Sequence, residues 1–336
     1  MELKRPYLLF LGDVPDALAA KTAIGIVDWR KEWCVGQMRL PGCGADTGLS
    51  DMDLQQAADA GAKTLIIGVV NAGGVLPEHW TGSIVAALNA GLDIASGLHL
   101  RLEDIPEIAD AAKRNGRLLH NVRQSDRSFK TGQGTKRDGM RLLTVGTDCS
   151  VGKKYTALAL EKGMREAGLD ANFCATGQTG VFISGRGVAI DAVIADFISG
   201  AAEWISPTTE PDVWQVVEGQ GSLFHPSFAG VSLGLLHGSQ PDAFVVCHET
   251  TRTNMRNVKH PLPTIQEVID HTIACGKLTN PGIRCVGIAV NTFALTEEVA
   301  SKTVQDISSE YGLPTVDPIR DSVALIVAKL KQEFSL

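Results

Sequence analysis

The sequence predicts an α/β protein with two domains: a Rossmann-like N-terminal domain with a parallel sheet, and a P-loop NTPase-like α/β domain at the C-terminus. Short apolar runs alternate with Ala- and Leu-rich segments along the chain, which is typical of parallel sheets with crossover helices. The run 64–70 is continuously apolar, as in strands covered on both faces. A glycine-bounded loop joins a strand at 142–145 to a helix at 154–167, which is the arrangement of a phosphate-binding P-loop.

The first domain is expected at residues 1–125. Its strands are predicted at 6–12, 24–27, 33–37, 64–70, 92–96 and 117–122. Its helices are predicted at 49–60, 80–89 and 105–115, with Ser50 as the N-cap of the first. Asn71, Gly73 and Gly74 follow a strand at the sheet edge where ligands bind, although a simple glycine turn explains them equally well. No G-x-G-x-x-G motif is present, so nothing indicates NAD binding.

A polar, glycine-rich and basic stretch at 126–139 is the expected linker, and the second domain is expected at 140–336. Its strands are predicted at 142–145, 170–176, 212–217, 242–247, 285–290 and 314–316. Its helices are predicted at 154–167, 191–202, 231–237, 264–274, 297–311 and 323–333. A glycine-rich loop is predicted at 177–187. Polar clusters follow several of these strands, so the sheet edge is where we expect the chemistry.

The composition narrows the class of protein. The chain has 336 residues, of which 44% are hydrophobic and 21% charged, as in ordinary globular proteins. The net charge of −7 gives no basic footprint for nucleic acid. No apolar run approaches the roughly 18 residues of a membrane span, and the run from Tyr7 is too short for a signal peptide. Seven cysteines without a CxxC pair favour reduced thiols. We therefore expect a cytoplasmic protein without nucleic-acid or membrane partners.

The P-loop departs from the standard motif in two ways. It runs through Gly146, Thr147, Asp148, Cys149, Ser150, Val151, Gly152 and Lys153, and the helix continues with Lys154 and Tyr155. Five residues separate the two glycines instead of four, and Lys154 replaces the Ser or Thr whose hydroxyl binds Mg²⁺. A second ammonium neutralises phosphate directly. The sequence thus predicts a phosphate ligand that needs no catalytic metal; a glycine-rich turn without a ligand is the alternative.

Several other side chains are candidates for chemistry. Glu218 ends the strand at 212–217, where it can hold a metal, act as a base or support the P-loop. Cys149 lies near two lysines that lower a thiol pKa, so an acyl-cysteine is possible, although a small loop-filling residue is the simpler interpretation. His225 and His248 lie after a strand or in a Gly/Pro-rich loop, and they are either bases or structural. Arg252 and Arg256 either bind a carboxylate or phosphate bidentately or form a solvated loop.

The loop 146–153, GTDCSVGK, resembles the Gly-Thr-Asp-x-x-Val-Gly-Lys-Thr loop of dethiobiotin synthetase and related ligases. Weaker similarities are Glu218-Gly219 and Asn291-Thr292. Lys154 removes the Mg²⁺-binding hydroxyl of that family. An ATP- and Mg²⁺-dependent ligase or kinase is therefore the second functional hypothesis, and a nucleotide- or coenzyme A-sensing module without catalysis is the third.

Nearly the whole chain resembles the D-glutamate N-acetyltransferase family, formerly a domain-of-unknown-function family. The similar blocks are GTDCSVGKK, ATGQTG, GRGVAIDAV, VEGQGSL and CHETTR. The resemblance implies an enzyme that transfers acetyl from acetyl-CoA, its co-substrate, to the amine of D-glutamate. We also expect a homo-oligomer, and the two lysines of the P-loop lead us to expect no metal requirement.

The resemblance also suggests roles for individual residues. The coenzyme A phosphates are expected at residues 146–155, and the small amino-acid substrate in an interdomain cleft beside Asn71, Gly73, Gly74, Gln178 and Glu218. Glu218 is the first choice as general base, with His248 or His225 second. Arg252 or Arg256 is expected to bind the glutamate carboxylates.

Overall fold

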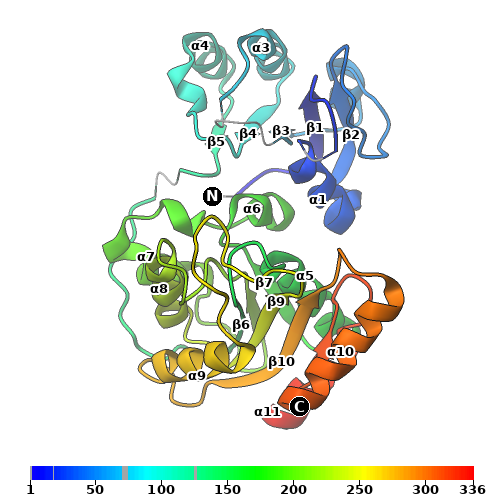
Figure 1. The fold of residues 1–336 in the computed structure, drawn as a ribbon. Helices are drawn as coiled ribbons and strands as arrows, with labels where there is room; N and C mark the ends of the chain where they lie inside the picture. Colours follow the sequence, from blue (N-terminus) through cyan, green and yellow to red (C-terminus); the bar gives the residue numbers. More distant parts are fainter. Residues whose placement is uncertain (1, 18, 70–74, 125–126) are drawn as a thin grey trace. The chain divides into compact units, whose positions relative to one another are not determined.

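The computed structural model describes residues 2–17, 19–69, 75–124 and 127–336, and the chain forms two compact units (Figure 1). The first comprises Met1–Arg127 and Gly177–Ala192, and the second comprises Ser128–Thr176 and Val193–Leu336. Each unit has its own parallel sheet, so the predicted fold class is confirmed. The sequence assigned 177–192 to the second domain, whereas these residues pack with the first unit.

The first sheet has the strand order β2-β1-β3-β4-β5, and all neighbouring strands are parallel. Its strands are β1 (Tyr7–Gly12), β2 (Cys34–Arg39), β3 (Thr64–Ile67), β4 (Asp93–Ser96) and β5 (Leu119–Asn121). The helices of this unit are α1 (Lys21–Arg30), α2 (Leu54–Asp59), α3 (Thr81–Asn89), α4 (Pro106–Asn115) and α6 (Gln178–Ser184). The central strands β1, β3 and β4 are buried along their whole length. This burial explains the mostly apolar sequences of β1 and β3, whereas β4 begins with Asp93 and ends with Ser96.

Three sequence predictions in this unit are wrong. Residues 24–27 belong to helix α1 and not to a strand, because Thr22, Ala23, Gly25 and Ile26 are buried at helical spacing. Helix α2 begins at Leu54 instead of 49, since Asp53 and Gln56 form a capping box that fixes its start. Residues 178–184, expected as a loop, form α6.

The second sheet has the strand order β11-β10-β9-β6-β8-β7, again with parallel neighbours. Its strands are β6 (Met140–Gly146), β7 (Ala171–Cys174), β8 (Trp214–Val217), β9 (Ala243–Glu249), β10 (Arg284–Asn291) and β11 (Thr315–Val316). β6, the strand that leads into the P-loop, lies between β8 and β9. The segments that follow β8 and β9 therefore flank the P-loop at the carboxyl edge of this sheet.

The helices of this unit form two groups (Figure 1). They are α5 (Lys153–Glu166), α7 (Ile198–Ile205), α8 (Ala229–Ser239), α9 (Ile265–Gly276), α10 (Glu297–Tyr311) and α11 (Ala324–Phe334). α5 packs against α11, whereas α8 packs against α7 and α9. The helix predicted at 191–202 is instead two 3₁₀ turns followed by α7, which continues to Ile205.

Residues 128–139, which are most of the linker expected at 126–139, belong to the second unit and are hydrogen-bonded to it. Lys136 Nζ lies 2.7 Å from Asp242 Oδ1, and Arg137 Nε donates to the carbonyl oxygen of Ser206 at 3.0 Å. These two contacts hold the segment that precedes β6 against the rest of the second unit. Among the described residues, no helix combines the length and the apolar character that crossing a membrane requires.

Candidate functional site

The P-loop connects the carboxyl end of β6 to the first turn of α5. Gly152 has a φ of 106°, a left-handed conformation that glycine adopts without steric cost. Ser150 also has a positive φ, 55°. These two residues turn the chain so that the loop wraps around the N-terminus of α5, where helix geometry leaves backbone N–H groups without partners.

The backbone of the loop has its donors and acceptors arranged for an anion. Arg252 Nη1 donates to the carbonyl oxygen of Cys149 at 2.8 Å, and Ser222 Oγ donates to that of Thr147 at 3.3 Å. Within the described part of the chain, the N–H groups of residues 148–152 donate to no protein acceptor. Side chains therefore donate hydrogen bonds to carbonyl oxygens of the loop, while a run of its N–H groups remains available for phosphate oxygens.

Two lysines follow the loop at the start of α5. Lys153 is only 6% exposed, and its Nζ donates to the carbonyl oxygen of Asp148 at 2.7 Å. Burial lowers the pKa of Lys153, because a desolvated ammonium is less stable than one in water. Lys154 is half-buried, with Nζ 4.5 Å from the centre of the Tyr155 ring. Both cations lie where the helix N-terminus adds partial positive charge, which favours a phosphate ligand.

Asp148 anchors the loop to the segment that follows β9. Its side chain is fully buried, and its Oδ2 accepts from Arg252 Nη1 at 2.6 Å and from the Arg256 N–H at 2.7 Å. Arg256 Nη1 in turn donates to Ser150 Oγ at 2.6 Å. Both arginines that the sequence proposed for carboxylate binding thus contact the P-loop. Among the described residues, Asp148 Oδ1 has no hydrogen-bond partner.

His248 lies on β9 beside the P-loop. Its Nδ1 is 3.1 Å from the hydroxyl of Thr147. Burial lowers the pKa of His248 below its ordinary value of 6.5, with the neighbouring Arg252 adding to this effect and Glu249 opposing it. The imidazole is therefore neutral at neutral pH, which is the form that can accept a proton.

Glu218 is buried directly after β8 and is held from two sides. Its Oε2 accepts from the Thr176 N–H at 3.0 Å, and Thr176 Oγ1 donates to the Glu218 carbonyl oxygen at 2.6 Å. The next residue, Gly219, donates its N–H to Thr144 Oγ1 at 2.9 Å, and Thr144 donates to the Lys153 carbonyl oxygen at 3.2 Å. Thr144 connects the Glu218 segment to the P-loop helix, a role that the apolar strand pattern does not reveal.

His225, also a candidate base, has both ring nitrogens engaged. The Ser227 N–H donates to Nδ1 at 3.2 Å, so Nε2 carries the proton and donates to the Arg256 carbonyl oxygen at 3.0 Å. The ring is 1% exposed. This arrangement supports the loop around Arg256.

Cys149 differs from the sequence expectation in its acidity. The sequence suggested that nearby cations lower its pKa, but burial is the largest effect and raises it, although Lys153 and both arginines oppose the shift. The pKa shift is therefore opposite to the one that the sequence suggested, and the small loop-filling role of Cys149 stays the simpler interpretation.

Asp148, Cys149 and His225 each have a possible metal-ligand atom within 4.8 Å of the others. Arg252 already binds Asp148 Oδ2, and both nitrogens of His225 have partners. The cationic surroundings disfavour a further cation between these three side chains.

The remaining predicted residues lie elsewhere. Asn71, Gly73 and Gly74 fall outside the described residues. Gln178 begins α6 in the first unit, beside Gly97: a Cβ added to Gly97 would lie 2.8 Å from Gln178 Oε1.

Gly219 should tolerate no side chain. An added Cβ would lie 1.6 Å from the Thr144 carbonyl oxygen, a backbone atom that moves only if β6 moves. We expect Gly219→Ala to lower the free energy of unfolding by about 2–3 kcal/mol, as overpacked sites do. Urea unfolding measures this change.

Gly230→Ala is the matched control, because a Cβ added in α8 meets nothing within 4 Å. Alanine is the better helix former, so this variant should be stabilised by about 0.5–1 kcal/mol. Equal stability of Gly219→Ala and the wild type would contradict the close approach of the Glu218 segment to β6.

The fold and the site define a P-loop protein of the α/β class with a Rossmann-like domain ahead of the P-loop domain. Residues 128–327 match the P-loop domain DUF1611_C, and residues 38–125 match the Rossmann-like domain DUF1611_N; both are described as domains of unknown function. The chain belongs to the DUF1611 family.

Relatives and a solved structure agree with this assignment. A D-glutamate N-acetyltransferase of a Pseudoalteromonas species is 51% identical, covering 98% of this chain and 100% of the relative. A D-glutamate N-acetyltransferase of Tritonibacter scottomollicae is 50% identical, with coverages of 98% and 99%. The crystal structure of a DUF1611 family protein from Anabaena variabilis has a TM-score of 0.83 at 29% identity, covering 98% of this chain and 100% of that one. The family resemblance seen in the sequence is confirmed.

Proposed function

We propose that this protein is an N-acetyltransferase that moves the acetyl group of acetyl-CoA to the amino group of D-glutamate. The observation that carries the proposal is the pairing of an anion-binding P-loop with a neutral imidazole, His248, beside it. Relatives at 51% and 50% identity with this activity, each aligned over 98% of the chain, support the substrate assignment.

The P-loop suits the diphosphate of coenzyme A. The N–H groups of 148–152 supply hydrogen bonds to phosphate oxygens, and Lys153 and Lys154 supply charge. Acyl transfer from a thioester needs no divalent ion, which fits the absence of a Ser or Thr hydroxyl at position 154. Bound phosphate would give the ammonium of Lys153, now donating to the Asp148 carbonyl, an anionic partner.

His248 is our choice for the general base. An ammonium is not a nucleophile, so a proton must leave the substrate nitrogen before or as it attacks. The nitrogen then bonds to the thioester carbon, the carbon–sulfur bond breaks, and the departing thiolate receives a proton. A neutral imidazole can accept the first proton and return one to the sulfur. Thr147 orients the ring through its contact with Nδ1.

Glu218 and Arg256 have supporting roles in this proposal. The hydrogen bonds of Glu218 to Thr176 favour a function in holding the sheet edge in place. Arg256 is exposed and uses Nη1 on Ser150, so its guanidinium is our choice for a substrate carboxylate. The raised pKa of Cys149 favours direct transfer over an acyl-cysteine, because the thiolate is the nucleophilic form.

The test is thiol release from acetyl-CoA in the presence of D-glutamate and EDTA. The proposal expects D-glutamate-dependent release and a product with an acetylated amine. Thiol release with L-glutamate but not with D-glutamate would overturn the substrate assignment. Mg²⁺-dependent ATP turnover without thiol release would favour the ligase or kinase hypothesis. Tight coenzyme A binding without turnover would favour a sensing module. Cys149→Ser should retain its rate if transfer is direct.

Cellular location and assembly remain predictions. We propose a cytoplasmic enzyme, because each of the seven cysteines is a free thiol. We also propose a homo-oligomer, which light scattering coupled to gel filtration tests directly.

A further inference from the structure

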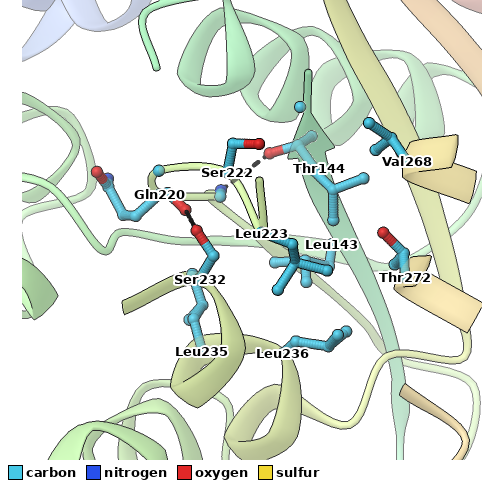
Figure 2. Close-up of a pocket in the computed structure, with 14 residues that line it drawn as sticks. Leu143, Thr144, Gln220, Ser222, Leu223, Ser232, Leu235, Leu236, Val268 and Thr272 are labelled. Atoms are coloured by element: carbon cyan, nitrogen blue, oxygen red, sulfur yellow. Dashed lines mark hydrogen bonds between the residues drawn. The ribbon is translucent and has the colours of Figure 1, made fainter. Parts of the chain in front are cut away.

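A small, mostly apolar pocket lies in the second unit beside the P-loop strand (Figure 2). Leu143 of β6 forms one wall, Leu235 and Leu236 of α8 form the second, and Val268 of α9 forms the third. Leu223, from the loop after β8, also lines it. Such a lining suits a short hydrocarbon group, because aliphatic side chains recognise size and shape.

The pocket contains a polar group that the protein does not satisfy. Thr272 on α9 is fully buried, and within the described part of the chain its Oγ1 has no hydrogen-bond partner. Figure 2 shows this hydroxyl on the pocket side of the helix. A buried hydroxyl without a partner is unfavourable, so the pocket favours a ligand that offers this hydroxyl a hydrogen-bond acceptor.

The rim of the pocket belongs to the site described above. Gly146, where the P-loop begins, contributes to the lining, and so does the Gly219–Ser222 segment directly after Glu218. The Gln220 carbonyl oxygen accepts from Ser232 Oγ at 2.7 Å, which ties this segment to α8 (Figure 2). The pocket therefore adjoins the first residue of the P-loop and the segment that follows Glu218.

We propose that the pocket receives the short acyl group of the donor thioester, with the hydroxyl of Thr272 donating to the acyl oxygen. This inference rests on the proposed acyl transfer and adds the site that selects the acyl chain. The leucines and Val268 contact the methyl end, and their closeness excludes longer chains. Thr272 supplies a donor for the negative charge that develops on the oxygen as the amine attacks.

The first experiment compares acetyl-, propionyl- and butyryl-CoA as donors, with kcat and KM measured separately. Val268→Ala widens the pocket, so the ratio of butyryl to acetyl kcat/KM should rise about tenfold or more, the usual value of a methylene in an apolar pocket. Ile269→Val is the control: Ile269 is the buried neighbour of Val268 on α9 but does not line the pocket, so the wild-type ratio should remain. Leu223→Ala is a second widening variant, in a loop, should Val268→Ala not fold.

The second experiment removes only the hydroxyl. Thr272→Val keeps the shape of the side chain and should lower kcat for acetyl-CoA about a hundredfold with little change in KM, as loss of an oxyanion donor does. Thr272→Ser, which retains a hydroxyl, should keep most of the rate. A purely structural role would affect stability, measured by urea unfolding, without this separation of kcat from KM.

The outcomes separate the two proposals. If the wild type transfers no acyl group from any of the three thioesters to D-glutamate, the proposed function fails. If it transfers acetyl but the widened variants keep the wild-type chain-length ratio and Thr272→Val keeps its kcat, the acyl pocket is wrong and the proposed function stands. An ordered water in the pocket would give this second result.

Discussion

Lys153→Met is expected to weaken acetyl-CoA binding about a hundredfold. Lys153 is the buried cation at the turn from the P-loop into α5, and its Nζ already donates to the Asp148 carbonyl inside the loop. A hydrogen bond to a charged group contributes about 1.5–3 kcal/mol, and methionine fills a similar volume without the charge. Isothermal titration calorimetry of acetyl-CoA in the presence of EDTA measures the affinity.

Two further lysines on α5 provide the comparison. Lys154→Met should weaken binding by a smaller factor, about fivefold to tenfold, because its half-buried ammonium is better screened. Lys162→Met is the control, since its side chain is 68% exposed two turns along the helix. Unchanged acetyl-CoA affinity in Lys153→Met, or Mg-ATP binding tightly where acetyl-CoA does not, would refute the P-loop assignment.

His248→Gln is expected to lower kcat about 10²- to 10⁴-fold, the usual effect of removing a general base. Glutamine preserves a polar contact with Thr147 but cannot take up a proton. The pH dependence of the wild type gives a second reading. Because burial lowers the pKa of His248 below 6.5, the imidazole stays neutral at neutral pH, and the rate should fall only as the pH drops below 6.5. This acid limb should disappear in His248→Gln.

Glu218→Gln separates the two candidate bases. If His248 is the base, Glu218→Gln should lower the rate less and retain the acid limb of the pH profile. His260→Gln, at an exposed position of the loop before α9, serves as the control and should behave as the wild type. Loss of the acid limb in Glu218→Gln and its retention in His248→Gln would assign the proton transfer to Glu218.

Local patterns predicted most of the fold. The strands β1 and β3 are buried along their whole length, so their sequences are mostly apolar and could be recognised alone. The prediction of a strand at residues 24–27 was wrong because isoleucine and valine favour strands locally. In the folded chain, Ala23 packs against Gly68 and the segment belongs to helix α1. Tertiary contact overrode the propensity of a short segment.

The candidate site also combines features that the local sequence predicts with features that only tertiary contacts create. The P-loop was recognisable because its function depends on consecutive backbone groups and the helix that follows. The Thr147–His248 contact joins residues 101 positions apart, and the Asp148–Arg252 pair joins residues 104 apart. Only the strand order, with β9 beside β6, brings these partners together.

The sequence by itself determined the class of fold, the phosphate-binding loop and the loss of the Mg²⁺-binding hydroxyl at Lys154, because each of these features depends on residues that are close together in the sequence. The tertiary structure decided which side chains act on that loop: Arg252 and Asp148 fix its backbone, and burial lowers the pKa of His248 and raises the pKa of Cys149. Burial and long-range contact set these properties, and both depend on how distant segments pack and not on the order of residues along the chain.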